Sequence, residues 1–148
     1  MTTDSNITQI VDESFIFRSL DEVVRAKLKT EAHTCQFAAG DIIIREGEPG
    51  TEMMIITRGK VSVSQRTAKG EVTLAQLGEK AVVGEVSVIS GIPRTGTVVA
   101  LEDVSVVCFS ADTIRGIIQS SPKVKSLLFK LVEGRAFQSM DAGKQASV

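Results

Sequence analysis

The residues with the clearest chemical potential lie in the stretch 83–98, where glycines, an acid and an arginine interrupt a strand pattern. Gly84 would let the backbone approach a ligand closely, and a short helical turn over residues 85–89 would direct free amide groups at an anion. Arg94 follows a proline and can offer a planar fork of donors to a phosphate diester. Glu85 can accept a hydrogen bond from a sugar hydroxyl. The stretch therefore indicates a site for a ligand that carries both an anion and a hydroxyl.

The same residues also permit a simpler interpretation. Glu85 and Arg94 can form an ordinary ion pair on the surface, with Gly84 and Gly91 serving only as turns around strands. Such surface pairs are common, and they stabilise a fold by only about 0–1 kcal/mol. On these residues alone both interpretations stay open, so the surrounding sequence has to decide between them.

Two helices are predicted ahead of any strand. Apolar residues at helical spacing predict a short amphipathic helix over residues 5–15. Ser19 to Glu22 has the pattern of a capping box, which predicts the start of a second helix. The expected apolar faces are Ile7, Ile10, Val11 and Phe15 in the first helix and Leu20, Val23, Val24 and Leu28 in the second.

From Thr34 to Ser110 the hydrophobic period changes from helical to two, most clearly in residues 60–64 and 71–74. Glycine-, proline- and aspartate-containing turns divide this region into many short strands. The pattern predicts a mainly β domain with flanking α-helices. Its centre is an antiparallel, double-stranded, jelly-roll-like β-roll, with helices on the N-terminal and the C-terminal side.

The helical period returns after the strands. Ser110 is a suitable N-cap for a short helix over residues 111–119. Ser121 and Pro122 then open a longer helix, in which Gly134 marks a bend or hinge. The apolar stripe of this helix must be buried somewhere; it consists of Val124, Leu127, Leu128, Leu131 and Val132.

With 148 residues, the chain has the profile of one domain, comprising N-terminal helices (1–33), a β-roll (34–110), C-terminal helices (111–140) and a tail or linker (141–148). A formal net charge of -1 gives no general attraction to nucleic acid or to an anionic membrane. The sequence shows no export signal and no apolar run of the ~18 residues that a membrane span needs. We therefore expect a cytoplasmic protein without direct nucleic-acid or membrane binding.

The cysteines and the histidine give no sign of a metal site at the level of sequence. Cys35 and Cys108 lie far apart, outside any C-x-x-C pattern, and are expected to be core thiols. His33 is the only histidine and is expected on the surface or in a loop. A cupin-like metal enzyme, whose β-roll has a similar shape, is disfavoured on this ground, and no metal is predicted.

The stretch 83–98 resembles the phosphate-binding cassette of cyclic-nucleotide-binding domains, F-G-E-[LI]-A-L-[IL]-x-x-x-P-R-[AS]-A-[TS]-V, without a gap. Residues 40–63 resemble the strand-turn-strand that precedes this cassette, and the resemblance extends over roughly residues 15–140. In layout the chain is similar to the sensor domains of catabolite-activator-type regulators and cyclic-nucleotide-dependent kinase regulatory subunits. Val83 replaces the usual phenylalanine and Gly96 the usual alanine, which predicts weaker binding. The identical positions are Gly84, Glu85, Ile89, Pro93, Arg94, Thr97 and Val98.

The resemblance implies a role for each matching residue. Arg94 would bind the exocyclic phosphate oxygens and Glu85 the ribose 2′-hydroxyl, beside the close approach at Gly84. The backbone N–H groups of Val86, Ser87 and Thr95 would complete the phosphate cradle. The Thr95 hydroxyl could also contact a purine held syn, which suits cGMP as well as cAMP. The implied ligand is therefore cAMP, with cGMP permitted, and no metal.

The C-terminal helix carries the predicted contacts to the base. Phe137 could form a lid over the base, and Arg135, Gln138 and Ser139 could touch its edge. The alternative is a simple solvated helix face. The resemblance suggests that the C-terminal helices swing in on binding, with Gly134 as hinge. The apolar stripe of residues 124–132 could also pair with a second copy to form a homodimer.

The predicted function is that of a regulatory sensor rather than an enzyme. A domain that binds without reacting signals by having two states of unequal ligand affinity. No effector follows the last helix, so the chain is expected to be part of a longer regulator, kinase, channel or phosphodiesterase. The alternative is a degenerate homologue that acts as an interaction or dimerisation module. Glu85 and Arg94 speak against this alternative, while Val83 keeps it open.

Overall fold

The computed structural model describes the backbone of residues 4–140 and the side chains of residues 4–133. Within these residues, eight strands form a roll, and helices precede and follow it. In chain order the elements are α1 (Ser5–Glu13), α2 (Glu22–Glu31), β1 (His33–Phe37), β2 (Ile42–Ile44), β3 (Glu52–Arg58), β4 (Val61–Thr67), β5 (Gly70–Leu77), β6 (Val82–Val83), α3 (Glu85–Ser90), β7 (Thr97–Ala100), β8 (Val104–Ser110), α4 (Ala111–Ser120) and α5 (Pro122–Met140).

The strands form two four-stranded sheets, in the orders β1-β8-β3-β6 and β2-β7-β4-β5, and every pair is antiparallel. Side chains along β3 alternate between two cores. Met53 and Ile55 pack in the core shared with the helices, whereas Met54 and Ile56 pack inside the roll. The predicted fold class, an antiparallel β-roll with helices on both sides, is confirmed.

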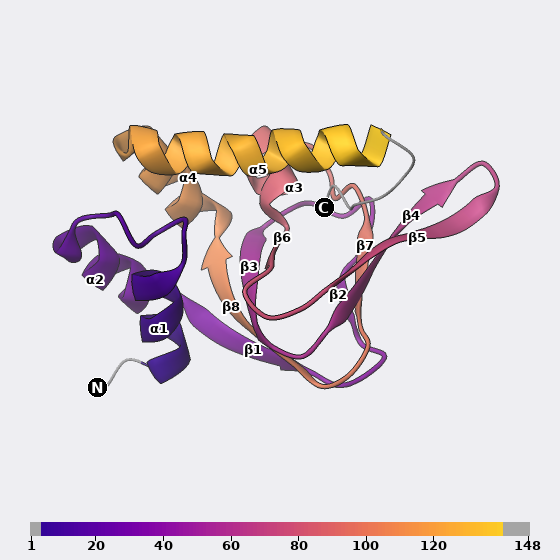
Figure 1. Cartoon of the computed structure of the whole chain (residues 1–148), viewed down its shortest axis with the longest axis horizontal. Coiled ribbons are helices and arrows are strands. Elements are labelled where there is room, and N and C mark those ends of the chain that lie inside the picture. The colour runs from indigo at the N-terminus through magenta and orange to yellow at the C-terminus, as the bar shows by residue number, and fades with distance from the viewer. Residues whose placement is uncertain (1–3, 141–148) are drawn as a thin grey trace.

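The helices cover two parts of the roll (Figure 1). α5 lies across one end of the roll and packs against α3 and α4, while α1 lies beside β1 and β8. The predicted cap of α4 is confirmed, since the Ser110 hydroxyl accepts a hydrogen bond from the Thr113 amide. Ser121 opens α5 as predicted, accepting from the Val124 amide at 3.3 Å. Within the described residues, no helix is long and apolar enough to cross a membrane.

The predicted capping box of the second helix is wrong. The N-cap of α2 is Asp21, and its side chain makes no capping hydrogen bond. Leu20 precedes the helix, where its amide donates to the Phe17 carbonyl and its side chain is buried. Val23, predicted on the apolar face, instead faces solvent with 80% of its surface exposed, and Leu28 is the buried residue of α2.

The apolar stripe of α5 is partly used within the chain. Val124 and Leu128 are 0% exposed in the core between the helices and the first sheet. These two residues are therefore not free to pair with a second copy, which corrects their predicted place in a dimer surface. Leu127, Leu131 and Val132 are half-buried. α5 continues as one helix through the position of Gly134.

Candidate functional site

The site is built around the short connection from β6 to α3. Gly84 joins the two elements in the left-handed conformation, with a φ of +86°. A Cβ at this position would lie 2.7 Å from Arg94 Nη1 and 2.9 Å from the Glu52 carbonyl oxygen. Glycine is thus required here for two reasons, its backbone conformation and the close approach of Arg94.

Arg94 is the buried cation of the site, with 6% of its surface exposed. Its Nη1 donates to the Gly84 carbonyl at 2.9 Å, and its Nη2 donates to the Glu52 carbonyl at 2.7 Å. Its backbone pairs with the loop before β3, because its amide donates to the Glu48 carbonyl at 2.8 Å and its carbonyl accepts from the Gly47 amide at 2.9 Å. These bonds fix the orientation of a guanidinium that carries five N–H donors, and three of the five are not used by these carbonyls.

Glu85 is the buried anion of the site. It is the first residue of α3 and is 0% exposed. Burial lowers the pKa of Arg94, and the carboxylates of Glu52, Glu85 and Glu48 oppose that shift by favouring the charged form. Because Glu85 and Arg94 are both buried, the interpretation of the two residues as a surface ion pair is wrong.

Two hydroxyl groups of the cassette have different surroundings. The Ser87 hydroxyl donates to the Ile92 carbonyl, which closes the loop that follows α3. The Thr95 Oγ1 is buried and has no hydrogen-bond partner among the described residues. The Thr95 carbonyl accepts from Gln65 Nε2 at 2.9 Å, so the residue itself is held in place. A fixed, buried and unpartnered oxygen is suited to a ligand that supplies the missing hydrogen bond.

The first turn of α3 and the two substituted positions of the cassette are also buried. Val86 is 7% exposed, and the amides of Val86 and Ser87 lie in the first turn of α3, where an α-helix supplies no internal acceptor. Val83, the substituted position, is 1% exposed and pairs with Met54 inside the roll. Gly96, the second substituted position, is also buried. The smaller residues at both positions are therefore accommodated within the packed fold.

The predicted base contacts fall in the last turns of α5. Arg135, Phe137, Gln138 and Ser139 belong to this helix, but their side chains lie outside the described residues. Their proposed roles in binding the base stay predictions.

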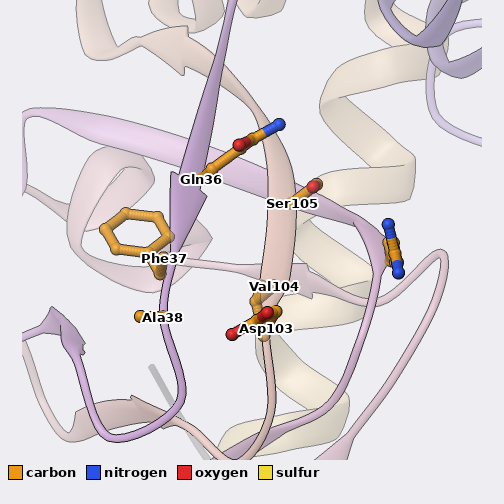
Figure 2. Close-up of a pocket in the computed structure, with 7 residues that line it drawn as sticks. Gln36, Phe37, Ala38, Asp103, Val104 and Ser105 are labelled. Carbon is orange, nitrogen blue, oxygen red and sulfur yellow. The ribbon is translucent and has the colours of Figure 1, made fainter.

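A pocket of about 290 Å³ lies elsewhere on the roll, at the far ends of β1 and β8. Figure 2 shows Gln36 and Phe37 on one strand beside Val104 and Ser105 on the other. Its cation, Arg58, is exposed, in contrast to the buried and doubly bonded Arg94. This pocket therefore has no fixed phosphate donor comparable to the cassette.

Several residues that shape the site were missed at the level of sequence. The Glu52 carbonyl accepts a hydrogen bond from the Arg94 guanidinium, and the Gln65 side-chain amide donates one to the Thr95 carbonyl. Gly50 passes so close to Ser87 that a Cβ there would overlap the serine side chain. Pro49 and Gly50 belong to the proline- and glycine-containing turns predicted between the strands, and that prediction gave no contact with Ser87. The positions of Glu52 and Gln65 on strands opposite the cassette had no local signal.

The cysteines and the histidine are also closer than their sequence spacing suggested. Cys108 is 0% exposed, as expected for a core thiol, and burial raises its thiol pKa. Cys35 is only half-buried and lies beside Cys108. His33 is exposed as predicted, but it lies in strand β1 rather than in a loop. The expectation of a core thiol is thus confirmed for Cys108, whereas Cys35 is only partly buried against the same core.

Comparison with known proteins identifies the family to which the chain is similar. The cyclic nucleotide-binding domain family matches residues 34–121, which is more than half of the chain. A CRP-like cAMP-activated global transcriptional regulator of Mycobacterium tuberculosis is 28% identical over 128 residues, covering 86% of this chain and 57% of that protein. A cyclic nucleotide-gated potassium channel of Mesorhizobium japonicum is 30% identical over 122 residues, covering 82% of this chain and 33% of the channel. The chain thus spans little more than half the length of the first of these relatives and a third of the second.

Solved structures give the same result for the fold. A cyclic nucleotide-binding domain from Methylobacillus flagellatus superposes with a TM-score of 0.73 at 27% identity, covering 93% of this chain and 80% of that one. The catabolite activator protein of Thermus thermophilus superposes with a TM-score of 0.71 at 23% identity, covering 86% and 60%. The chain belongs to the cyclic nucleotide-binding domain family.

Proposed function

We propose that this chain acts, over its whole length, as a regulatory domain that senses cAMP, with cGMP as a permitted ligand. The observation that carries the proposal is that one short segment buries the acid Glu85, the cation Arg94 and a Thr95 hydroxyl that has no hydrogen-bond partner among the described residues. A ligand that carries both an anion and a hydroxyl is complementary to an arginine, a carboxylate and a hydroxyl oxygen, and a cyclic nucleotide offers both. The similarity to a cAMP-activated regulator supports the choice of cAMP.

In this proposal each residue acts through the contacts described above. Arg94 gives its unused donors to the phosphate, and the amides of Val86, Ser87 and Thr95 complete the cradle around it. Glu85 accepts from the ribose 2′-hydroxyl, with Gly84 allowing the close approach. The carbonyls of Gly84 and Glu52, which accept hydrogen bonds from Arg94, would fix the guanidinium before the ligand binds, so that binding would require little further ordering of this side chain.

The signal would pass from α3 to the C-terminal helices. Arg115 on α4 donates from its Nε to the Val88 carbonyl on α3 at 3.0 Å, and α5 packs against both helices. If α3 shifts when the phosphate binds, the positions in which α4 and α5 pack against it would therefore change. The effector that receives this change would be a separate domain or protein, and a homodimer would use Leu127, Leu131 and Val132 of the α5 stripe.

The choice between bases needs a direct test, because not every related structure involves cAMP. The regulatory subunit of a cAMP-independent protein kinase A from Trypanosoma cruzi, solved with guanosine bound, has the same fold at a TM-score of 0.69 and 21% identity. Isothermal titration of the purified chain with cAMP and with cGMP measures the preference. We expect binding of cAMP, with cGMP weaker or equal.

The same titration with two arginine variants tests the site. Arg94→Ala removes charge-assisted contacts to the phosphate, which should lower affinity about ten- to hundredfold, equivalent to about 1.5–3 kcal/mol. Arg18→Ala is the matched control, because Arg18 is exposed in the loop after α1 and makes no side-chain hydrogen bond or ion pair among the described residues. Absence of binding by the native chain at millimolar nucleotide would instead identify a degenerate interaction module.

A further inference from the structure

Three potential metal ligands meet on one face of the first sheet. His33 and Cys35 are two residues apart on β1, so their side chains point to the same face. Cys108 on β8 is the register partner of His33 and shares that face. The ligand atoms of the three residues all lie within 4.8 Å of one another. The antiparallel pairing of β1 with β8 has thus brought together residues that are remote in the sequence.

Glu52 adds a fourth donor from the next strand. In the pairing of β3 with β8, Met54 is opposite Cys108, so Glu52 lies two residues further along on the same face. Its Oε2 lies 3.1 Å from His33 Nε2. The two thiols, the imidazole and the carboxylate therefore come from three adjacent strands.

We propose that His33, Cys35, Cys108 and Glu52 form a binding site for a thiophilic divalent cation, for which Zn²⁺ is the best match. Two sulfurs, one nitrogen and one oxygen are donors that zinc accepts in tetrahedral geometry, whereas calcium and magnesium require oxygen ligands. With zinc–sulfur bonds of about 2.3 Å, tetrahedral geometry places the two sulfurs about 3.8 Å apart. This distance falls within the 4.8 Å span of the His33, Cys35 and Cys108 ligand atoms, and Glu52 would approach the ion from its place beside His33.

A disulfide between the two cysteines fits the strand register less well. Cys35 is the register partner of Val106, so Cys108 lies on the diagonal from it. Diagonal residues in an antiparallel pair have Cα atoms about 7–8 Å apart, which exceeds the usual separation in disulfides. A metal ion can bridge that gap without movement of the strands.

The cluster also has a route to solvent and a structural role. β1 is the edge strand of its sheet, and the His33 side chain is 54% exposed, so the cluster opens to solvent at His33 while Cys108 is its buried end. Bound there, the ion would tie the edge strand to β8 and β3. It would also fix Glu52, whose main-chain carbonyl accepts a hydrogen bond from Arg94.

The test is zinc binding by the full chain, kept reduced with a phosphine and first stripped of metal. We expect one Zn²⁺ per chain by dialysis and metal analysis. His33→Ala, Cys35→Ser and Glu52→Gln should each lower zinc affinity by about tenfold or more. Thr34→Ala is the matched control, because Thr34 lies on the same strand with its side chain on the opposite face, and it should bind zinc like the native chain.

Cobalt substitution reports on the ligands directly. Co²⁺ added to the native chain should give a thiolate-to-cobalt absorption band that weakens in Cys35→Ser. Since Cys108 is fully buried, the inference does not depend on a Cys108 variant that folds. Absence of stoichiometric zinc, unchanged zinc affinity in His33→Ala and Cys35→Ser, or a cobalt spectrum without a thiolate band would overturn the proposal. None of these measurements involves a nucleotide, so they test the metal site independently of the proposed sensor function.

Discussion

Two glycines that bracket α3 offer a matched pair of substitutions at the site. Gly84 and Gly91 both have positive φ, +86° and +76°, so alanine at either position adopts the same unfavourable left-handed conformation. Their surroundings differ. A Cβ at Gly91 meets no atom within 4 Å, whereas a Cβ at Gly84 would lie 2.7 Å from Arg94 Nη1 and 2.9 Å from the Glu52 carbonyl oxygen. The difference in stability and affinity between the two variants therefore measures the contribution of the contact between Gly84 and the Arg94 guanidinium.

The expected losses follow from these contacts. Gly91→Ala should cost about 1–2 kcal/mol in free energy of unfolding, which is the penalty of the left-handed conformation alone. Gly84→Ala carries the same penalty and in addition displaces Arg94 from a charge-assisted hydrogen bond worth about 1.5–3 kcal/mol. The total for Gly84→Ala is then about 2.5–5 kcal/mol, a large share of the 5–15 kcal/mol typical of a domain.

Urea unfolding of the two variants without nucleotide measures this difference. The midpoint of Gly84→Ala should fall well below that of Gly91→Ala at an unchanged m-value. Titration with cAMP should then show roughly native affinity for Gly91→Ala and a loss of about tenfold for Gly84→Ala, because only the latter moves Arg94. Equal losses of stability and equal affinities in the two variants would refute the close contact between the Arg94 guanidinium and Gly84.

Four further substitutions test other contacts. Gly50→Ala should cost about 1–3 kcal/mol in urea unfolding, because its Cβ would overlap the Ser87 side chain; an unchanged midpoint would contradict that close approach. Thr95→Val should leave the nucleotide-free chain as stable or stabilise it by up to about 1–3 kcal/mol, since it removes a buried hydroxyl without a partner, yet weaken cAMP binding several-fold by titration. A loss of stability would count against this account of Thr95. Leu128→Ala, at a 0% exposed position, should lower the unfolding free energy by about 2–5 kcal/mol, and Phe129→Ala, at a 41% exposed one, by under about 1 kcal/mol; equal effects would mean that α5 does not dock as described.

The parts of the fold that follow from local pattern could be predicted from the sequence. Period-two alternation identified the strands of the roll, and the Ser110 cap identified the start of α4. The cassette could be identified because its glycines, acid and arginine are close together in the chain. Local signals failed at α2, where Asp21 rather than Ser19 is the N-cap, because the residue types of a capping box do not by themselves fix where a helix begins.

The parts that depend on strand pairing could not be predicted. The carbonyl of Glu52 reaches Arg94 only because β3 runs beside β6, and nothing near Glu52 in the sequence indicates this contact. The meeting of Cys35 with Cys108 depends on the register between β1 and β8, which a single sequence does not specify. Which face of α5 is buried also depends on where the helix docks, so the sequence pattern placed Val124 and Leu128 on a possible dimer surface although both are buried within the chain.

In the proposed function, the buried Glu85 binds the ribose and the buried Arg94 binds the phosphate of the same cyclic nucleotide. The most direct measurement is a thermodynamic cycle that compares cAMP with 2′-deoxy-cAMP on the native chain and on Glu85→Gln, by isothermal titration. The native chain should bind cAMP about ten- to hundredfold more tightly than the deoxy analogue, since the analogue lacks a hydrogen bond to a charged group, and Glu85→Gln should discriminate by less than about threefold. Equal affinity of the native chain for the two nucleotides would contradict the account.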